Sequence, residues 1–106
     1  MSFRVRLTRE AEADLERLFD YVLERELARE GGGDLDLAEQ ALVAIRAGIH
    51  TLQTSPFTCR KAGPSPFLRE LIITFGRSGD VALFEIVGSA EVVVAAVRHQ
   101  LESDYH

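Results

Sequence analysis

Apolar and polar positions first alternate along the chain and then recur with the period of a helix. Residues 3–7 alternate apolar and basic side chains, which is the pattern of a half-buried strand. Thr8 follows as a predicted helix N-cap, because its hydroxyl oxygen can accept a hydrogen bond from an unpaired backbone N–H. An apolar stripe at helical spacing then predicts a helix over about residues 9–29, ended by the glycines at 31–33.

A second apolar stripe predicts another helix, which runs from near Asp36 to about Leu52. Asp36 followed by Glu39 has the spacing of a capping box, in which two side chains satisfy backbone N–H groups at the helix start. Gly48 lies inside the stripe and predicts a close approach of the two helices. Because a short glycine-rich turn joins the stripes, we expect an antiparallel helical hairpin.

The second half of the chain carries strand patterns separated by turn residues. Residues 54–66 contain three prolines and predict a loop, and residues 77–80 predict a turn. Three strands are expected, at residues 67–75, 81–87 and 92–97. The last of them is an unbroken apolar run, which is typical of a strand covered on both faces.

These elements follow the order β-α-α-β-β-β and predict an α+β fold. Each element must bury its apolar face on another layer. We therefore expect a two-helix antiparallel hairpin packed on one face of a mostly antiparallel four-stranded sheet. At 106 residues the chain has the size of one domain, so a single domain over residues 1–106 is predicted.

Charge and cysteine content narrow the classes of function. The net charge of −5 argues against a protein that grips nucleic acid through its phosphates, so we do not expect direct nucleic-acid binding. A local basic patch is present all the same, because residues 57–79 carry four basic side chains against Glu70 alone. The single cysteine, Cys59, is interpreted as a passive thiol, and no Cys/His cluster has zinc spacing. We expect no metal and no cofactor.

The hydropathy of the chain bears on its location. No apolar run has the length of a signal peptide core or of a membrane span. Together with the lone cysteine, this predicts a protein of the reducing cytoplasm that makes no contact with membranes.

Several short groups of residues follow one another along the chain in a recognisable order. They are Thr8 with Ala11, then Asp14-Leu15 and Tyr21; Leu52, Pro56 and Arg60; Arg69-Glu70-Leu71; and Ala96-Val97-Arg98-His99-Gln100 followed by Glu102, Asp104 and Tyr105. In this order the groups resemble the RelE/ParE toxins over essentially the whole chain. The last group is the most specific, because it is similar to the C-terminal tail of ParE-type members.

The resemblance implies the toxin of a type II toxin–antitoxin system. ParE-type toxins poison DNA gyrase, and antitoxins, often ParD-type, neutralise them through a C-terminal segment that orders on the toxin. DNA gyrase as the target and a ParD-like antitoxin as the partner are therefore expected. RelE-type relatives have the same fold but cut messenger RNA on the ribosome, so the fold alone does not decide between the two functions.

Basic and aromatic side chains of the second half are the candidates for contact with a target or partner. They are Arg60, Arg69, Arg77, Arg98, His99 and Tyr105. If the chain is a ribonuclease, the candidate catalytic residues are Arg69, Arg77 and His99, because metal-free RNA cleavage needs an acid, a base and cations at the phosphate.

A non-enzymatic gyrase inhibitor is nevertheless the expected function. Many relatives carry a tyrosine in the middle hairpin strand where this chain has Phe84, which lacks a hydroxyl. The chain also has one lysine, Lys61, and its overall charge does not suit an enzyme that grips the ribosome.

Structural roles compete with the functional ones at each position. Arg69 is equally well interpreted as the partner of a carboxylate at the sheet edge, and His99 as a structural histidine that points inward. His50 is expected on a solvated helix face.

The antitoxin surface and the retention of toxicity stay open at the level of sequence. The acidic face of the first helix is either simply solvated or pairs with basic residues of an antitoxin. The groove between helices and sheet, or an exposed sheet edge, can accept an antitoxin segment as well. A toxin that has lost its target and persists only as an antitoxin-bound scaffold is a third possibility.

Overall fold

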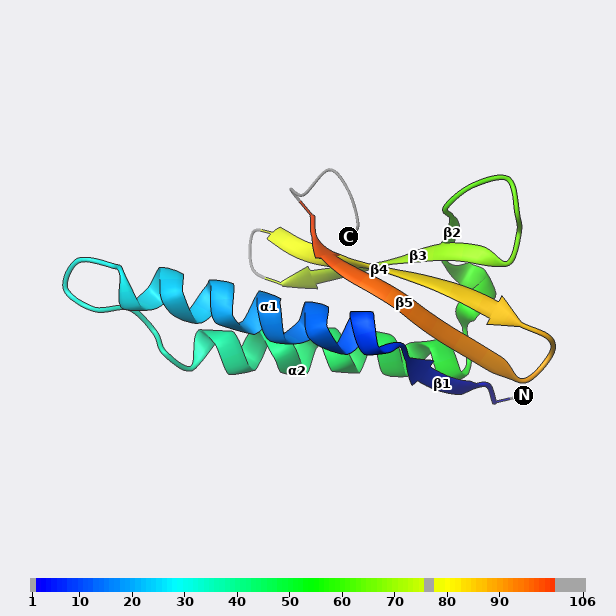
Figure 1. Cartoon of the computed structure of the whole chain (residues 1–106), viewed down its shortest axis with the longest axis horizontal. Helices are drawn as coiled ribbons and strands as arrows, with labels where there is room; N and C mark the ends of the chain where they lie inside the picture. The colour runs from blue at the N-terminus through cyan, green and yellow to red at the C-terminus, as the bar shows by residue number, and fades with distance from the viewer. Residues whose placement is uncertain (1, 76–77, 101–106) are drawn as a thin grey trace.

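The computed structural model describes residues 2–75 and 78–100, and two α-helices and five strands account for most of them (Figure 1). The elements are β1 Arg4–Leu7, α1 Arg9–Leu27, α2 Leu37–His50, β2 Arg60–Lys61, β3 Leu68–Phe75, β4 Ser78–Val87 and β5 Glu91–His99. Short 3-10 turns at Thr51–Gln53 and Pro56–Thr58 lie between α2 and β2. The helices pack together on one sheet, so the predicted α+β fold is confirmed.

The sheet has the strand order β1-β5-β4-β3-β2 and is antiparallel except for the parallel pair β1–β5. It has one strand more than the four expected. The additional strand, β2, lies inside the predicted loop 54–66 and pairs with only two residues of β3. A two-residue strand is too short to show hydrophobic alternation, which is why the sequence pattern misses it. β4 also begins earlier than expected, at Ser78 within the predicted turn.

Thr8 is the N-cap of α1, as predicted. The Thr8 hydroxyl oxygen accepts a hydrogen bond from the Ala11 backbone N–H at 3.1 Å. The same hydroxyl donates to the Ala95 carbonyl at 3.1 Å and so ties the helix start to β5. After the helix ends at Leu27, Gly31 and Gly32 adopt φ values of 81° and 86° and turn the chain toward α2. Residues with a Cβ avoid this backbone region, so glycine suits both positions.

The capping box predicted at the start of α2 is wrong. Asp36 does precede the helix, but its backbone is helical, with φ −76° and ψ −12°, and its side chain makes no capping hydrogen bond. A capping side chain reaches the first helical N–H groups from an extended backbone, which Asp36 does not have. Asp34 acts just before it instead, because its Oδ1 accepts a hydrogen bond from the Asp36 N–H at 3.0 Å.

Gly48 brings α2 close to the sheet, and not to α1 as expected. A Cβ at this position would lie 2.9 Å from Cγ1 of Ile73 in β3, which is closer than side chains normally pack. The reason is the face on which the glycine stands. Ile45 and Ile49, three residues before and one residue after Gly48, are both buried in the core that covers the sheet.

The core lies between the helical hairpin and one face of the sheet. Phe84 of β4 is fully buried within it. Its members are Ala11, Leu15, Leu18, Ile45, Ile49, Leu52, Ile73, Ala82, Phe84, Ile86, Val92, Val94 and Val97. Both predicted helical stripes therefore face the sheet. Figure 1 shows the two helices side by side on one face of it, with the loop between them extending past the end of β3 and the start of β4.

β5 contains a bulge that its apolar pattern hides. Phe84 pairs with Val94 whereas Leu83 pairs with Ala96, so Ala95 has no partner on β4. A bulge inserts one extra residue into one strand and shifts the alternation of side chains beyond it. The residues on either side of Ala95 are therefore out of phase with each other.

The bulge explains most of the unbroken apolar run at residues 92–97. Val94 and Val97 both face the core, although they are three positions apart and regular alternation would place them on opposite faces. Cover on both faces, expected for this strand, is only partial at Val93 and Ala95, because neither is exposed and neither is fully buried.

Polar side chains of α1 complete the edge of β5 where β1 stops. β1 pairs with β5 only as far as Val94. Beyond it, the Val97 N–H donates a hydrogen bond to Asp14 Oδ2 at 2.9 Å, and Arg17 Nη2 donates to the Val97 carbonyl at 3.4 Å. Asp14 is buried, so this carboxylate takes the place of a neighbouring strand as a hydrogen-bond acceptor.

Candidate functional site

The predicted contact residues that the structure describes fall into two groups at opposite ends of the sheet. Those on the described chain are Arg60, Arg69, Arg98 and His99, and those outside the described residues are Arg77 and Tyr105. On β4, Arg69 pairs with Phe84 whereas His99 pairs with Asp80. Four residues of strand separate these two positions, which corresponds to about 13 Å along β4. The structure therefore does not bring Arg69 and His99 to one phosphate-sized site.

Arg69 binds the backbone of the segment that precedes β3. Its Nε donates a hydrogen bond to the Pro66 carbonyl at 2.7 Å, and its Nη1 donates to the carbonyls of Phe57 and Cys59 at 3.0 and 2.6 Å. Its guanidinium carbon lies 5.2 Å from the centre of the Phe57 ring. We call this arrangement the Arg69 clamp. The prediction that Arg69 pairs with a carboxylate is wrong, because its acceptors are main-chain carbonyls.

Arg60, near the clamp, pairs across the strands β2 and β3. Its Nε lies 3.0 Å from Oε1 of Glu70, its partner in the register of β2 and β3. The Arg60 side chain is more than half exposed. The Glu70 side chain is 15% exposed. Ion pairs with a solvent-exposed partner stabilise a protein by about 0.2–1 kcal/mol, so we expect the Arg60–Glu70 pair to contribute less than the hydrogen bonds of the clamp.

Cys59 lies half-buried under the clamp. Burial raises the pKa of the Cys59 thiol, and the positive charge of Arg69 only partly opposes this effect. The thiolate is the reactive form of cysteine, so a raised pKa makes this side chain a poor nucleophile at neutral pH. This agrees with the interpretation of Cys59 as a passive thiol.

His99 forms the other group together with two residues of α1. The centre of its ring lies 6.4 Å from that of Tyr21, with an angle of 52° between the ring planes. The Arg25 guanidinium carbon lies 5.8 Å from the centre of the Tyr21 ring on the same helix. Asp80 and Phe75 line the small cavity of about 30 Å³ beside these three side chains. We call this group of five residues the His99 corner.

The His99 corner contains residues that the sequence reasoning misses. Tyr21 enters the sequence analysis only through the family resemblance, and Arg25 does not enter it. Their spacing of four residues places both side chains on one face of α1, which is a signal available from sequence. The spacing does not show that this face lies beside the end of β5, because this depends on how α1 packs against the sheet. His99 itself is half-buried, and His50 is exposed on α2, as predicted.

Arg98 belongs to the opposite face of β5, because successive side chains of a strand alternate between its faces. Its Nη1 lies within hydrogen-bond distance of the carbonyls of His99 and Gln100, at 3.2 and 3.4 Å. Arg98 therefore folds back onto the end of its own strand.

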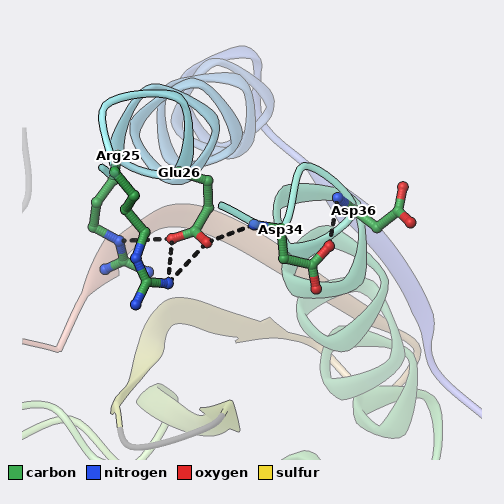
Figure 2. Close-up of polar contacts among 5 residues, drawn as sticks. Arg25, Glu26, Asp34 and Asp36 are labelled. Carbon is green, nitrogen blue, oxygen red and sulfur yellow. Dashed lines mark hydrogen bonds and ion pairs between the residues drawn. The ribbon is translucent and has the colours of Figure 1, made fainter. Parts of the chain in front are cut away.

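A buried carboxylate organises the loop between the helices. Glu26 exposes 1% of its surface, and its Oε1 accepts hydrogen bonds from the Asp34 N–H at 3.0 Å and from Arg29 Nη1 at 3.1 Å. Arg25 Nε lies 3.7 Å from its Oε2. Figure 2 shows the carboxylate between Asp34 on one side and the cationic groups on the other. We call this arrangement the Glu26 latch.

The electrostatics of the Glu26 latch favour the ionised carboxylate. The hydrogen bond from the Asp34 N–H lowers the pKa of Glu26 against the effect of burial, and the charges of Arg29 and Arg25 lower this pKa further. Gly33 belongs to the same arrangement, because a Cβ there would lie 2.5 Å from the Glu26 carbonyl oxygen. A glutamate in the last turns of a helix is usually solvated, which is why the sequence does not point to Glu26.

Comparisons with known proteins agree with this architecture. A family model described as the ParE toxin of the type II toxin–antitoxin system parDE matches residues 5–103. A solved structure titled as the chromosomal ParDE toxin–antitoxin system from P. aeruginosa has a TM-score of 0.68 and 22% sequence identity. The match covers 92% of this chain and 96% of the other, and at this identity it shows the shared fold. No curated protein matches the chain significantly.

The family match spans nearly the whole chain, from β1 to beyond the end of β5. The chain therefore belongs to the ParE toxin family of type II toxin–antitoxin systems.

Proposed function

We propose that this member of the ParE toxin family inhibits DNA gyrase without cleaving nucleic acid, and that a ParD-like antitoxin neutralises it. The observation that carries the proposal is the Arg69 clamp. Three main-chain carbonyls engage the Arg69 guanidinium, and the residue stands about 13 Å along the sheet from His99. Two of the three groups that a ribonuclease would use are thus separated, while a surface that binds a protein target does not need them together.

The residue in the middle of the sheet also argues against RNA cleavage. Phe84 is fully buried and has no hydroxyl, so this position offers no acid or base for RNA cleavage. The net charge of −5 does not favour the ribosome as a target either.

The proposed target surface is the His99 corner, together with Arg98 and the tail beyond it. Tyr21 and Arg25 are exposed, and arginine and tyrosine are among the residues that contribute most to protein–protein binding. Tyr105, six residues after His99 in the chain, lies outside the described residues and stays a predicted contact residue of this tail. Arg60 and Arg77 remain predicted contact residues without a structural argument for or against them.

We also propose that the chain acts in the cytoplasm, as one domain over residues 1–106, because gyrase and its DNA are there. Within the described residues, neither helix has the length and hydropathy needed to cross a bilayer. One core unites both helices with strands β3, β4 and β5, which supports a single folding unit.

The experiment that tests the proposal is plasmid supercoiling by purified gyrase, with increasing amounts of the folded toxin free of antitoxin. We expect inhibition and trapped linear DNA, and we expect the ParD-like antitoxin to relieve both. A folded protein that leaves gyrase unaffected and cuts messenger RNA on ribosomes would establish the RelE-type function instead. A folded protein that does neither, and that does not arrest growth, would be a toxin that has lost its target.

A further inference from the structure

The Glu26 latch and the His99 corner share one residue, Arg25. Its guanidinium carbon lies 5.8 Å from the centre of the Tyr21 ring, and its Nε lies 3.7 Å from Glu26 Oε2. Among the residues that the structure describes, these are the charged and aromatic contacts of the Arg25 side chain. Arg25 therefore connects a buried carboxylate beside the hairpin loop to an exposed ring of the corner.

Contacts other than Arg25 fix the position of the Glu26 carboxylate. Its Oε1 accepts hydrogen bonds from the Asp34 N–H at 3.0 Å and from Arg29 Nη1 at 3.1 Å. Gly33 closes the space beside it, because a Cβ at Gly33 would lie 2.9 Å from the same oxygen atom. Figure 2 shows the Arg25 side chain reaching this carboxylate from the helix. Glu26 is therefore a fixed negative charge to which Arg25 is attached.

The exposure of Arg25 makes such an attachment effective. The Arg25 side chain is 49% exposed, and fixing one rotamer of an exposed arginine costs more conformational entropy than it does for most side chains. One exposed cation–π contact with Tyr21 is a weak restraint. The ion pair with the buried carboxylate of Glu26 adds a second restraint that water and salt screen less. Together the two contacts hold the guanidinium over the Tyr21 ring.

The position of Arg25 bears directly on the His99 corner. The centre of the Tyr21 ring lies 6.4 Å from that of the His99 ring, so Tyr21 is the neighbour of both Arg25 and His99. All three side chains also line the same small cavity. A partner that binds this corner meets an arginine, a tyrosine and a histidine together. Side chains that hold their bound position before the partner arrives lose less entropy on binding.

We propose that Glu26 is a positioning residue for the target surface, because it holds Arg25 over Tyr21 and so arranges the His99 corner for binding to DNA gyrase. This inference rests on the proposed function, since it takes gyrase to be the partner of the corner. It adds a role in target binding for Glu26, which is too buried to touch the target itself.

The first part of the test locates Arg25 in the purified toxin, without gyrase. Nuclear Overhauser effects between the side-chain protons of Arg25 and the ring protons of Tyr21 report the contact. We expect them in wild type, and we expect clearly weaker ones in Glu26→Gln, which loses the charge but keeps an acceptor for the loop. The matched control is Glu24→Gln, which removes an exposed carboxylate next to Arg25 in the sequence and should leave the signals unchanged. Wild-type signals in a folded Glu26→Gln would overturn the positioning role.

The second part is a double-mutant cycle in the gyrase supercoiling assay, with circular dichroism to check that each variant folds. We expect the toxin concentration for half-inhibition to rise about tenfold in Arg25→Ala and about threefold in Glu26→Gln, and to stay at the wild-type value in Glu24→Gln. Because Glu26 acts through Arg25, Glu26→Gln should cause no further loss in the Arg25→Ala background.

The other outcomes separate this role from its alternatives. An equal loss from Glu26→Gln in both backgrounds would show a general structural effect and overturn the inference. Wild-type inhibition by Arg25→Ala, an exposed position, would overturn it as well, whether or not Glu26→Gln folds. A wild-type toxin that does not inhibit gyrase would instead remove the proposed function, and with it the role of Glu26 in target binding.

Discussion

Arg69 and His99 stand at opposite ends of one sheet, and the surrounding chain uses their side chains differently. The donors of Arg69 are directed at three main-chain carbonyls of its own loop. His99 lies half-buried beside the exposed ring of Tyr21, at the mouth of a small cavity. One residue holds a loop in place, while the other belongs to a partly open surface.

This difference shows that residue type and local basic charge do not by themselves predict function in this fold. Both residues are predicted as contact residues for the same chemical reason, namely a cationic or titratable side chain near the sheet. The loop that comes before β3 has few regular hydrogen bonds, so its carbonyls need donors. Arg69 meets that need.

The largest expected effect comes from breaking the clamp. We predict that Arg69→Ala lowers the free energy of unfolding by about 2–4 kcal/mol, because three carbonyls lose a charged donor and Phe57 loses its packing partner. Urea unfolding measures this change. Arg60→Ala is the matched control. Arg60 makes a single, partly exposed ion pair nearby, so this substitution should lower the free energy of unfolding by less than about 1 kcal/mol.

The outcome for activity separates the clamp from a target surface. The fraction of Arg69→Ala that is folded should inhibit gyrase as wild type does. A fully folded variant with no inhibition would place Arg69 on the target surface and would contradict a purely structural role for this residue.

His99→Ala should show the opposite behaviour. We expect its free energy of unfolding to stay within about 1 kcal/mol of wild type, while the toxin concentration needed for half-inhibition of gyrase rises about tenfold. Supercoiling titrations measure the second quantity. His50→Ala removes the same side chain from an exposed position of α2 and should leave inhibition unchanged; wild-type inhibition by His99→Ala would exclude the corner as the target surface.

The smallest effect at neutral pH is expected at the Glu26 latch, where a second charged side chain holds a loop. Because the pKa of Glu26 in the folded protein lies below its ordinary value of 4.5, the ionised carboxylate contributes stability above pH 4.5. That contribution is lost as the pH falls through the lowered pKa, when the carboxylate takes up a proton.

Glu26→Gln should therefore make the free energy of unfolding fall less steeply as the pH is lowered. Glutamine keeps an acceptor for the Asp34 N–H but does not titrate. Unfolding measured at a series of values between about pH 3 and pH 7 tests this. Glu30→Gln changes an exposed glutamate of the same loop and should retain the wild-type profile. If both variants have the same profile as wild type, the latch does not stabilise the loop through its charge.

Much of the fold is predictable because it depends on local periodicity. The apolar stripes of α1 and α2, the Thr8 cap and the hairpins of the second half each follow from residues close together in the sequence. The failures have a different origin. β2 depends on pairing with β3, the bulge at Ala95 depends on the register with β4, and the conformation at Asp36 depends on the loop before it.

The candidate site also has features that the sequence predicts and features that it does not. The chemical types of Arg69 and His99 are evident from sequence, and the family resemblance that places them is confirmed by the match over residues 5–103. Their partners are not evident, because Arg69 binds carbonyls up to twelve residues away and His99 meets Tyr21 from the other end of the chain. The sequence gives no signal for the role of Glu26, because only the folded loop buries its side chain.

By itself, the sequence determines the order of elements and the faces that form the core, because helical and strand periodicities are properties of neighbouring residues. Only the tertiary structure decides that the basic candidates separate into the Arg69 clamp and the His99 corner. This separation depends on strand register and on how α1 packs against α2 and β5, and contacts between distant parts of a chain leave no periodic trace in its sequence.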